Sequence, residues 1–347
     1  MKAVVLVGGE GTRMRPLTET IPKPLLPLVD RPILDHVLDH LVAHGVHEVI
    51  MSSPYLEDTF HPFLEARRGD PAITWVTEIE PLGTGGAIVS VLDRVGDDPF
   101  LALNGDILTD LDLTEMVAAH RDRSAAVTIA LHHVEDARAF GLVASDPDGR
   151  ITEFREKPTE LVPGDINAGT YVLDPAALAA WPAGVYHWIE GEIFPALIRD
   201  RADVFGFPSD AYWLDLGTPE QYLRAHADLL DGAVRGRSYP APWVGEGADV
   251  DPEARLGRHA VVGPAARVSA GADVDGSVLL PSAIVGPRAR VRGSVLGTGA
   301  VVGEGATLEG SVVGEGGSVA DGVVLDGERV PASASVTNGS GSGTVPA

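Results

Sequence analysis

Apolar and polar positions alternate along residues 3–231 in a pattern that predicts strands and helices in turn. Short runs rich in Val, Ile and Leu predict strands at 3–8, 47–53, 73–78, 99–106, 125–134, 168–174 and 203–208. Helical periodicity predicts helices near 32–44, 55–67 and 85–95. Strands that alternate with helices predict a mostly parallel sheet covered on both faces.

Two helix starts carry capping signals. Residues 112–115 (DLTE) and 218–221 (TPEQ) both have the sequence of a capping box, and the second has Pro at the first helical position. We therefore expect helices to begin directly after Asp112 and Thr218.

From residue 244 the pattern changes, because Val or Leu recurs in groups of three spaced six residues apart, and matching positions of the last four groups are 17 apart. These residues lie at 244, 250, 256, 262, 268, 274, 279, 285, 291, 296, 302, 308, 313, 319 and 325. An α-helix cannot produce this period, whereas a triangular solenoid with three flat faces places one such residue inward on each face. The pattern predicts five coils. Glycine often follows the inward residue, at 257, 263, 286, 297, 303 and 314, and we expect it to form tight corners.

These patterns divide the chain into four segments. Residues 1–231 form an α/β domain, 232–243 a linker and 244–326 the solenoid. Residues 327–347 are rich in Gly, Ser and Ala, which predicts a disordered tail.

Composition narrows the function classes. The chain has 50 Asp and Glu against 26 Lys and Arg, a net charge of -24, which argues against nucleic-acid and membrane partners. It has no Cys, so disulfides, thiolate metal sites and Cys nucleophiles are excluded. The first apolar run ends in glycines and is too short for a signal peptide or a membrane span. We expect a cytoplasmic protein.

One loop is basic in this acidic chain. Residues 6–27, LVGGEGTRMRPLTETIPKPLLP, carry Arg13, Arg15 and Lys23 against two Glu residues. The loop follows a strand, and its glycines allow backbone N–H groups to approach an anion closely. Its prolines prevent a helix directly afterwards and stiffen the arm that carries Lys23. The loop therefore predicts a phosphate site, although its spacing fits neither a dinucleotide fingerprint nor a P-loop.

Six motifs, in order, resemble those of the sugar-1-phosphate nucleotidylyltransferases. They are GGEGTRMRPLT…PKPLLP, EPLGTGGAI, LNGDI, FREKP, INAGTYVL and WLDLGTPEQYL. Within the family the chain most resembles the mannose-1-phosphate guanylyltransferases. The resemblance implies a Rossmann-like, mixed and mainly parallel nucleotidyltransferase domain over 1–231, followed by a left-handed β-helix of hexapeptide coils over 244–326.

The resemblance implies transfer of a nucleotidyl group from a nucleoside triphosphate to a sugar 1-phosphate with release of pyrophosphate, an EC 2.7.7 reaction. The nucleophile is already an anion, so positioning and charge neutralisation carry the rate without a general base. Arg13 would stabilise the α-phosphate and the leaving pyrophosphate, and Lys23 would bridge the two reacting phosphates. The residues implied to hold the triphosphate are Gly8, Gly9, Gly11, Thr12 and Arg13.

By the same resemblance, Asp106 and Asp215 would hold Mg²⁺. Two carboxylates suffice, because Mg²⁺ also takes phosphate oxygens and water as ligands. On their own, Asp106 could equally begin a turn, and Asp215 could serve the helix that begins near Thr218.

Glu78 predicts which nucleotide base is bound, because it lies where relatives specific for uracil or thymine usually have Gln. A carboxylate only accepts hydrogen bonds, and guanine offers adjacent N1–H and N2–H donors. Guanine is therefore favoured as the base, and GTP as the nucleotide, with adenine as the next candidate base. Gly83 and Thr84 would pack against the base.

For the acceptor, the resemblance implies that Lys157 grips the sugar phosphate. The residues that would meet the sugar are Gly141, Glu156, Asn167 and Glu190. Around Glu190 the chain departs from the family, which usually reads Ser-[Val/Ile]-Glu-[Arg/Lys]-Glu where this chain has WIEGE at 188–192. Mannose 1-phosphate is the expected acceptor, with another hexose or a cyclitol 1-phosphate such as valienol 1-phosphate as the alternative.

Two other classes remain as alternatives. One is a non-catalytic regulatory subunit that binds a nucleotide sugar, against which the intact Arg13, Lys23, Asp106 and Asp215 argue. The other is an acyltransferase built on the β-helix, where the coils offer only His259 as a catalytic His. We expect the β-helix to mediate contacts in a homo-oligomer, a hypothesis that a monomeric mass in solution would reject.

Overall fold

The computed structural model describes residues 1–53, 57–67 and 69–338. Contacts group the chain into two compact units. Unit 1 comprises Met1–Gly9 and Leu34–Trp213, and unit 2 comprises Glu10–Ile33 and the chain from Leu214 onward. The basic loop thus groups with the C-terminal part, so contacts do not follow the segments expected from sequence, and those domain boundaries stay a prediction.

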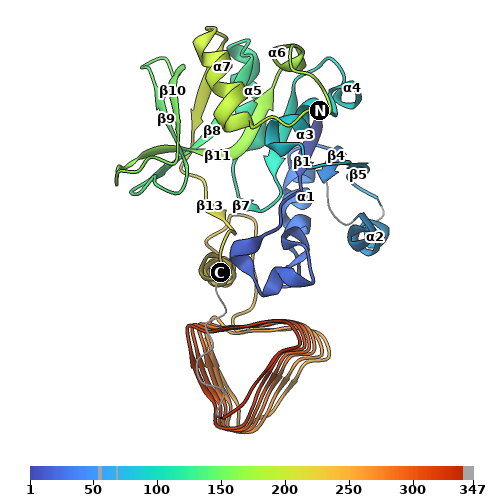
Figure 1. Cartoon of the computed structure of the whole chain (residues 1–347), viewed down its shortest axis with the longest axis vertical. Coiled ribbons are helices and arrows are strands. Elements are labelled where there is room, and N and C mark those ends of the chain that lie inside the picture. Colours follow the sequence, from blue (N-terminus) through green and yellow to red (C-terminus); the bar gives the residue numbers. More distant parts are fainter. Residues whose placement is uncertain (54–56, 68, 339–347) are drawn as a thin grey trace. The chain divides into compact units, whose positions relative to one another are not determined.

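Unit 1 is built on one mixed nine-stranded sheet (Figure 1), whose main path runs β10-β9-β11-β6-β1-β4-β5. The strands are β1 (Lys2–Leu6), β4 (Glu48–Ser53), β5 (Ala72–Thr77), β6 (Phe100–Asn104), β8 (Val127–Val134), β9 (Gly141–Ser145), β10 (Ile151–Glu156), β11 (Gly164–Leu173) and β12 (Val204–Pro208). β1 pairs in parallel with β4 and β6, and β5 extends this parallel half beyond β4. β11 runs antiparallel to β6, β8 and β9. The predicted mixed α/β fold is confirmed.

Each strand predicted from an apolar run is present, and a hairpin was missed. β9 and β10 pair antiparallel at the edge of the sheet. The sequence of β10, ITEFRE, is mostly polar, since an edge strand exposes much of its surface to water. Two further short strands are β7 (Ile107–Thr109) and β13 (Trp213–Asp215).

The predicted helices are present, one of them divided in two, and the short helices α6 and α7 were not predicted. They are α1 (Ile33–Ala43), α2 (Glu57–Ala66), α3 (Gly83–Val89), α4 (Leu92–Val95), α5 (Leu113–Asp122), α6 (Pro175–Leu178), α7 (Phe194–Arg199) and α8 (Pro219–Leu230). The helix expected at 85–95 is two helices, α3 and α4, and residues 55 and 56 of the helix expected at 55–67 lie outside the described residues. Both predicted caps are confirmed: Asp112 accepts from the Glu115 amide at 2.9 Å, and Thr218 from the Gln221 amide at 3.3 Å.

The C-terminal part of unit 2 is a β-helix with the triangular coils seen in Figure 1. Its short strands stack into three parallel sheets, β14-β17-β20-β23-β26-β29, β15-β18-β21-β24-β27-β30 and β16-β19-β22-β25-β28. They are β14 (Trp243–Val244), β15 (Asp249–Val250), β16 (Arg255–Leu256), β17 (Val261–Val262), β18 (Arg267–Val268), β19 (Asp273–Asp275), β20 (Val278–Leu279), β21 (Ile284–Val285), β22 (Arg290–Arg292), β23 (Val295–Leu296), β24 (Val301–Val302), β25 (Thr307–Glu309), β26 (Val312–Val313), β27 (Ser318–Val319), β28 (Val324–Asp326), β29 (Arg329–Val330) and β30 (Ser335–Val336). Val262 pairs with Leu279 and Leu279 with Leu296, as the repeat predicts, and the inward Val and Leu side chains form one core. The prediction is wrong for Val244, which is 45% exposed on the first strand of the stack and lies outside this core.

The glycines after the inward residues have a different role from the one expected. A Cβ on Gly263 would lie 2.6 Å from the Leu279 carbonyl oxygen, and one on Gly297 would lie 2.7 Å from the Gly314 carbonyl carbon. These glycines therefore allow the backbones of stacked coils to approach closely. Corners are instead made by residues with positive φ, both glycines such as Gly271 (φ 69°) and side-chain residues such as Arg288 (φ 57°).

The β-helix continues beyond its predicted end, whereas the predicted linker before it has no regular structure up to Trp243. The tail expected from residue 327 is wrong for 327–338, because β29 and β30 continue two of the stacked sheets. Residues 339–347 of that tail lie outside the described residues. The predicted linker contains neither helix nor strand before Trp243. In the part of the chain that the structure describes, no helix combines the length and the apolar character needed to cross a membrane.

Candidate active site

Unit 1 contains a cavity of about 260 Å³ at the carboxyl ends of β1 and β4. Its lining residues are Leu6, Gly8, Gly9, Ser52, Glu78, Pro81, Gly83, Thr84, Ala87 and Tyr186. Parallel sheets place ligands at this edge because the loops that leave the strands meet there. The structure thus brings together five residues that the sequence predicts to hold the nucleotide, and adds Ser52 and Tyr186.

Glu78 is a fixed acceptor in the wall of this cavity. Its residue surface is only 7% exposed, and its two carboxylate oxygens accept hydrogen bonds from the Ser52 hydroxyl at 2.8 Å and the Leu82 amide at 3.0 Å. Two donors on different segments hold the carboxylate in one orientation, and each oxygen keeps a further acceptor position. Sequence reasoning missed Ser52, although its place at the end of a predicted strand beside β1 was a usable signal.

Gly83 is required by close packing at the start of α3. Its φ is 69°, and a Cβ there would lie 2.7 Å from the His187 carbonyl oxygen and 3.0 Å from the Tyr186 ring. The amides of Gly85 and Gly86 both donate to the same His187 carbonyl, at 2.9 and 3.1 Å. The segment that carries Tyr186 is therefore packed directly on the first turn of α3, which explains how an aromatic ring reaches the cavity.

A chain of hydrogen bonds connects this cavity to the residues predicted to bind the sugar. Thr84 Oγ1 donates to Glu190 Oε2 at 2.9 Å, and the Tyr171 hydroxyl donates to Glu190 Oε1 at 3.3 Å. Asn167 Nδ2 donates to the Tyr171 hydroxyl at 2.8 Å. Thr84, Asn167 and Glu190 were predicted from separate motifs, whereas Tyr171, which joins two of them, was missed because it reads as a core residue of β11.

Burial raises the pKa values of two residues in this series of hydrogen bonds, Glu190 and Tyr171. It raises the pKa of Glu190 above its ordinary value, despite hydrogen bonds that favour the carboxylate. Burial, with the nearby charge of Glu190, also raises the pKa of Tyr171 well above its ordinary value. Tyr171 is therefore a neutral hydrogen-bond donor at physiological pH.

Lys157 extends from the end of the β9–β10 hairpin. Its backbone is in the left-handed region, with φ 43°, and its amide donates to the Phe140 carbonyl at 2.9 Å. Its ammonium lies 3.5 Å from Glu156 Oε1, and the side chain is 65% exposed. A Cβ on Gly141 would lie 2.9 Å from Glu156 Oε2, so glycine leaves room for that carboxylate.

Trp188 and Gly191, the two departures from the family pattern, pack against each other. Residues Ile189–Ile193 form a π-helix, η4, directly after Trp188. A Cβ on Gly191 would lie 2.2 Å from Trp188 Cε3, so the indole ring covers the Gly191 backbone. The large Trp and the absent side chain are thus one packing arrangement beside Glu190.

Unit 2 holds the remaining predicted residues of the basic loop. The loop folds as three short 3-10 turns, η1 (Thr12–Met14), η2 (Leu17–Glu19) and η3 (Lys23–Leu25), and no α-helix begins before Ile33, as predicted. Arg13 Nη2 lies 3.9 Å from Asp215 Oδ2, and its side chain is 65% exposed. A Cβ on Gly217 would lie 2.7 Å from Arg13 Nη2. The first and last motifs therefore meet at Arg13 and Asp215.

Gly11 and Thr12 begin the first of these turns, and Lys23 begins the third. Gly11 has φ 58°, and its carbonyl accepts from Thr18 Oγ1 at 2.8 Å. Arg15 Nη2 lies 3.6 Å from Glu10 Oε2, an exposed ion pair.

Asp106 and Asp215 offer the oxygen donors that Mg²⁺ prefers. Asp106 follows β6 in unit 1, where the Gly105 amide donates to the Leu6 carbonyl at 2.9 Å, and Asp215 belongs to unit 2. Among the described residues no group of three or more His, Asp or Glu side chains forms a metal site.

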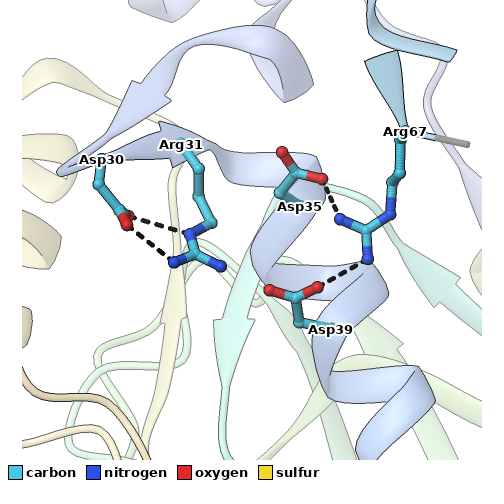
Figure 2. A network of polar contacts seen from close by, with 5 residues as sticks. All are labelled: Asp30, Arg31, Asp35, Asp39 and Arg67. Atoms are coloured by element: carbon cyan, nitrogen blue, oxygen red, sulfur yellow. Dashed lines mark hydrogen bonds and ion pairs between the residues drawn. The ribbon is translucent and has the colours of Figure 1, made fainter. Parts of the chain in front are cut away.

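Two arginines outside these segments, Arg67 and Arg31, pair with carboxylates. Figure 2 shows Arg67, just after α2, reaching Asp35 and Asp39 on α1, and the Arg67–Asp39 contact is 2.6 Å. In unit 2, Arg31 forms a bidentate pair with Asp30, whose Oδ1 also accepts from the Tyr239 hydroxyl at 3.0 Å. These two arginines pair with carboxylates within the protein, so we do not assign them to a phosphate site.

Comparison with known proteins gives matches over both parts of the chain. Residues 2–232 match the family model described as nucleotidyl transferase, and residues 239–343 match the GMPPB C-terminal domain. A mannose-1-phosphate guanylyltransferase of Mycobacterium tuberculosis is 40% identical over 288 residues, covering 80% of this chain and 79% of its own length. The mannose-1-phosphate guanylyltransferase catalytic subunit beta of Xenopus tropicalis is 36% identical over 268 residues, covering 75% and 74%.

A solved structure is also similar. The crystal structure of HddC from Yersinia pseudotuberculosis complexed with GMP-PN has a TM-score of 0.58 and 28% identity, covering 65% of this chain and 97% of that one.

Proposed function

The chain belongs to the nucleotidyl transferase family, and from this premise we propose that it transfers the guanylyl group of GTP to mannose 1-phosphate. Nucleotidyl transfer to a sugar 1-phosphate follows from the family and from relatives at 32–40% identity. The observation that carries the choice of GTP is Glu78, a buried and doubly anchored carboxylate in the wall of the cavity.

The base pocket favours guanine on hydrogen-bond grounds. Ionised Glu78 offers only acceptor positions, which match the adjacent N1–H and N2–H donors of guanine. A pyrimidine would place a carbonyl against this carboxylate and leave it without a donor. The Tyr186 ring and Gly83 offer flat surfaces for the base, and Gly8 and Gly9 offer backbone N–H groups for the phosphates.

The reaction is an in-line displacement at the α-phosphorus of GTP. A phosphate oxygen of mannose 1-phosphate forms the new P–O bond, and the bond to the oxygen that bridges to the β-phosphate breaks, releasing pyrophosphate. We assign Arg13 to the α-phosphate and the leaving group, and Lys23 to the two phosphates that react. Asp106 and Asp215 would hold Mg²⁺, which neutralises phosphate charge when bound. The nucleophile is already ionised, so the protein's task is to orient it and to neutralise charge.

We assign the acceptor to the residues around Glu190. Lys157 would hold the sugar phosphate, and Glu190, Asn167 and Glu156 would accept from or donate to the hydroxyls. A second candidate, another hexose or a cyclitol 1-phosphate, is favoured by the covered Gly191, where the family's usual cation is absent.

The test is pyrophosphate release with Mg²⁺ across five nucleoside triphosphates and a panel of sugar and cyclitol 1-phosphates. We expect turnover with GTP and mannose 1-phosphate. Turnover with GTP and a different acceptor would support the second candidate. Release from none of the pairs would support the non-catalytic subunit.

Two expectations stay predictions. Homo-oligomerisation through the β-helix is tested by light scattering of the full chain, and a cytoplasmic location by fractionation of the cells that make it.

A further inference from the structure

We propose that the last coil of the β-helix positions the catalytic loop, with Arg329 as the residue that fixes the loop backbone around Arg13. The inference rests on the proposed function, since the importance of Arg13 comes from nucleotidyl transfer. It assigns to the C-terminal domain a direct part in the reaction.

The contacts lie within unit 2 and join residues far apart in sequence. Arg329 Nη1 donates to the carbonyl oxygens of Arg13 at 3.0 Å and Arg15 at 2.9 Å. Three residues further along the same coil, the Ala332 amide donates to Glu19 Oε2 at 2.9 Å. One coil of the β-helix thus contacts the loop at three points, from the first 3-10 turn to the second.

The loop gains from such external donors because it is built of short 3-10 turns. Within the first turn the Met14 amide donates to Gly11 at 2.9 Å and the Arg15 amide to Thr12 at 3.2 Å. Short 3-10 turns have poor hydrogen-bond geometry and little stability of their own. A guanidinium that binds the carbonyls of Arg13 and Arg15 fixes both peptide planes, and with them the direction in which the Arg13 side chain leaves the backbone.

The far end of the loop is held by α8, the helix that follows the motif with Asp215. His226 Nδ1 accepts from the Val29 amide at 3.2 Å, and the Tyr222 hydroxyl donates to the Pro27 carbonyl. The stretch that carries Lys23 therefore lies between two anchored points. Without Arg329 the anchor nearest Lys23 would remain, while the one at Arg13 would be lost.

Arg329 also acts on the first turn of α8. The pKa of Glu220 is lowered by its hydrogen bond with Thr218 and, to a smaller extent, by the charge of Arg329. Arg329 is thus close to the two segments that supply Arg13 and Asp215.

The experiment compares Arg329→Ala with the wild-type full chain and with Arg267→Ala as a matched control. Arg267 is also an arginine on a β-helix strand, but its ion pair is with Asp249 inside the β-helix. For each protein we would measure amide hydrogen exchange of the peptide covering residues 10–20, kcat and KM for both substrates, and the melting temperature. Glu19→Ala, which removes the acceptor of the Ala332 amide, is the second variant.

We expect Arg329→Ala to speed exchange in residues 10–20 while the rest of the β-helix keeps its protection. We expect kcat to fall by about 10- to 100-fold, the scale of a misplacement near 1 Å, with KM for mannose 1-phosphate within about twofold. Glu19→Ala should change both readouts in the same direction by less, and Arg267→Ala should change neither.

Unchanged exchange in residues 10–20 of Arg329→Ala, with kcat within about twofold of wild type, would overturn the proposal. A general loss of protection over the β-helix, shared by Arg267→Ala, would also overturn it, because the effect would then be one of folding. If the wild-type chain itself has no transferase activity, the proposed function fails, yet the exchange data still report whether Arg329 orders the loop.

Discussion

Two carboxylates of unit 1, the buried Glu78 and the partly exposed Glu190, differ in the groups that surround them. Glu78 accepts hydrogen bonds from a hydroxyl and a backbone amide. Glu190 accepts from Thr84 and Tyr171, yet burial still raises its pKa above the ordinary value. The first environment suits a permanent acceptor for a base, and the second suits a group that must respond to the hydroxyls of a substrate.

Replacing Glu78 with Gln tests whether this carboxylate recognises the guanine base. The amide presents an N–H₂ group where guanine also presents donors, so one hydrogen bond to a charged acceptor is lost. We expect kcat/KM for GTP to fall by about 10- to 100-fold, since such a bond is worth about 1.5–3 kcal/mol. Steady-state pyrophosphate release with GTP and UTP is the measurement. Unchanged discrimination between GTP and UTP would remove Glu78 from the base site.

Replacing Glu190 with Gln gives a prediction for stability against pH. Burial raises the pKa of Glu190 in the folded protein, so protonated Glu190 contributes stability that is fully present below the ordinary pKa of 4.5. This contribution is lost as the pH rises through the raised pKa of the folded protein. Gln stays neutral, so the melting temperature of the variant relative to wild type should rise with pH across this window. Melting curves from about pH 4 to pH 8 measure it.

The same variant should lose affinity for the acceptor. We expect KM for the sugar phosphate to rise by about tenfold, because a hydrogen bond to a charged group is removed. A relative melting temperature independent of pH would show that Glu190 is not the titrating group, and an unchanged KM would place it outside the sugar site.

At the scale of elements, the π-helix η4 shows how two sequence changes act as one. Residues 188–192 differ from the usual family pattern at Trp188 and Gly191, which read as two separate losses. In the structure the Trp188 ring occupies the space that any side chain on residue 191 would need. The element is therefore repacked, with Glu190 kept on the side of Thr84.

Gly191→Ala alone is expected to destabilise the protein by about 1–3 kcal/mol, since the new methyl group overlaps the indole ring. In the Trp188→Ala background the same change should cost much less. Chemical unfolding of the two single variants and the double variant measures the coupling, which we expect to be at least about 1 kcal/mol. Additive effects would show that the two positions are independent.

At the scale of the molecule, the candidate residues are shared between two units. The cavity, Asp106 and the sugar-binding residues belong to unit 1, whereas Arg13, Lys23 and Asp215 belong to unit 2. Unit 2 also contains the β-helix, whose last coil contacts the loop. Contacts thus tie Arg13, to which we assign the α-phosphate, to the C-terminal part of the chain.

Removal of divalent metal should abolish turnover in the whole enzyme. We expect EDTA to stop pyrophosphate release and added Mg²⁺ to restore it. Asp106→Asn and Asp215→Asn should each lower kcat by about 100-fold or more and raise the Mg²⁺ concentration needed, because metal neutralisation of phosphate is worth several kcal/mol. Asp110→Asn, in the same region of the chain, is the control. Activity that survives EDTA would exclude a metal-dependent mechanism.

The sequence by itself determined the features that repeat locally. Strands and helices of the α/β part follow from hydrophobic periodicity, the β-helix follows from its repeat of six, and the capping residues Asp112 and Thr218 act on amides only three residues away. The edge hairpin β9–β10 was not predicted from the sequence, because an exposed strand needs no apolar run. The motifs also indicated the residue types of the candidate site, but not which of them touch.

Only the tertiary structure decided the contacts between distant positions. Thr84 meets Glu190 across 106 residues, and Arg329 meets Arg13 across 316. It also showed that the β-helix glycines serve close stacking, and that Trp188 fills the space above Gly191. The physical reason is that a hydrogen bond or a packed ring depends on where the folded chain brings two groups, and local patterns carry no record of that partner.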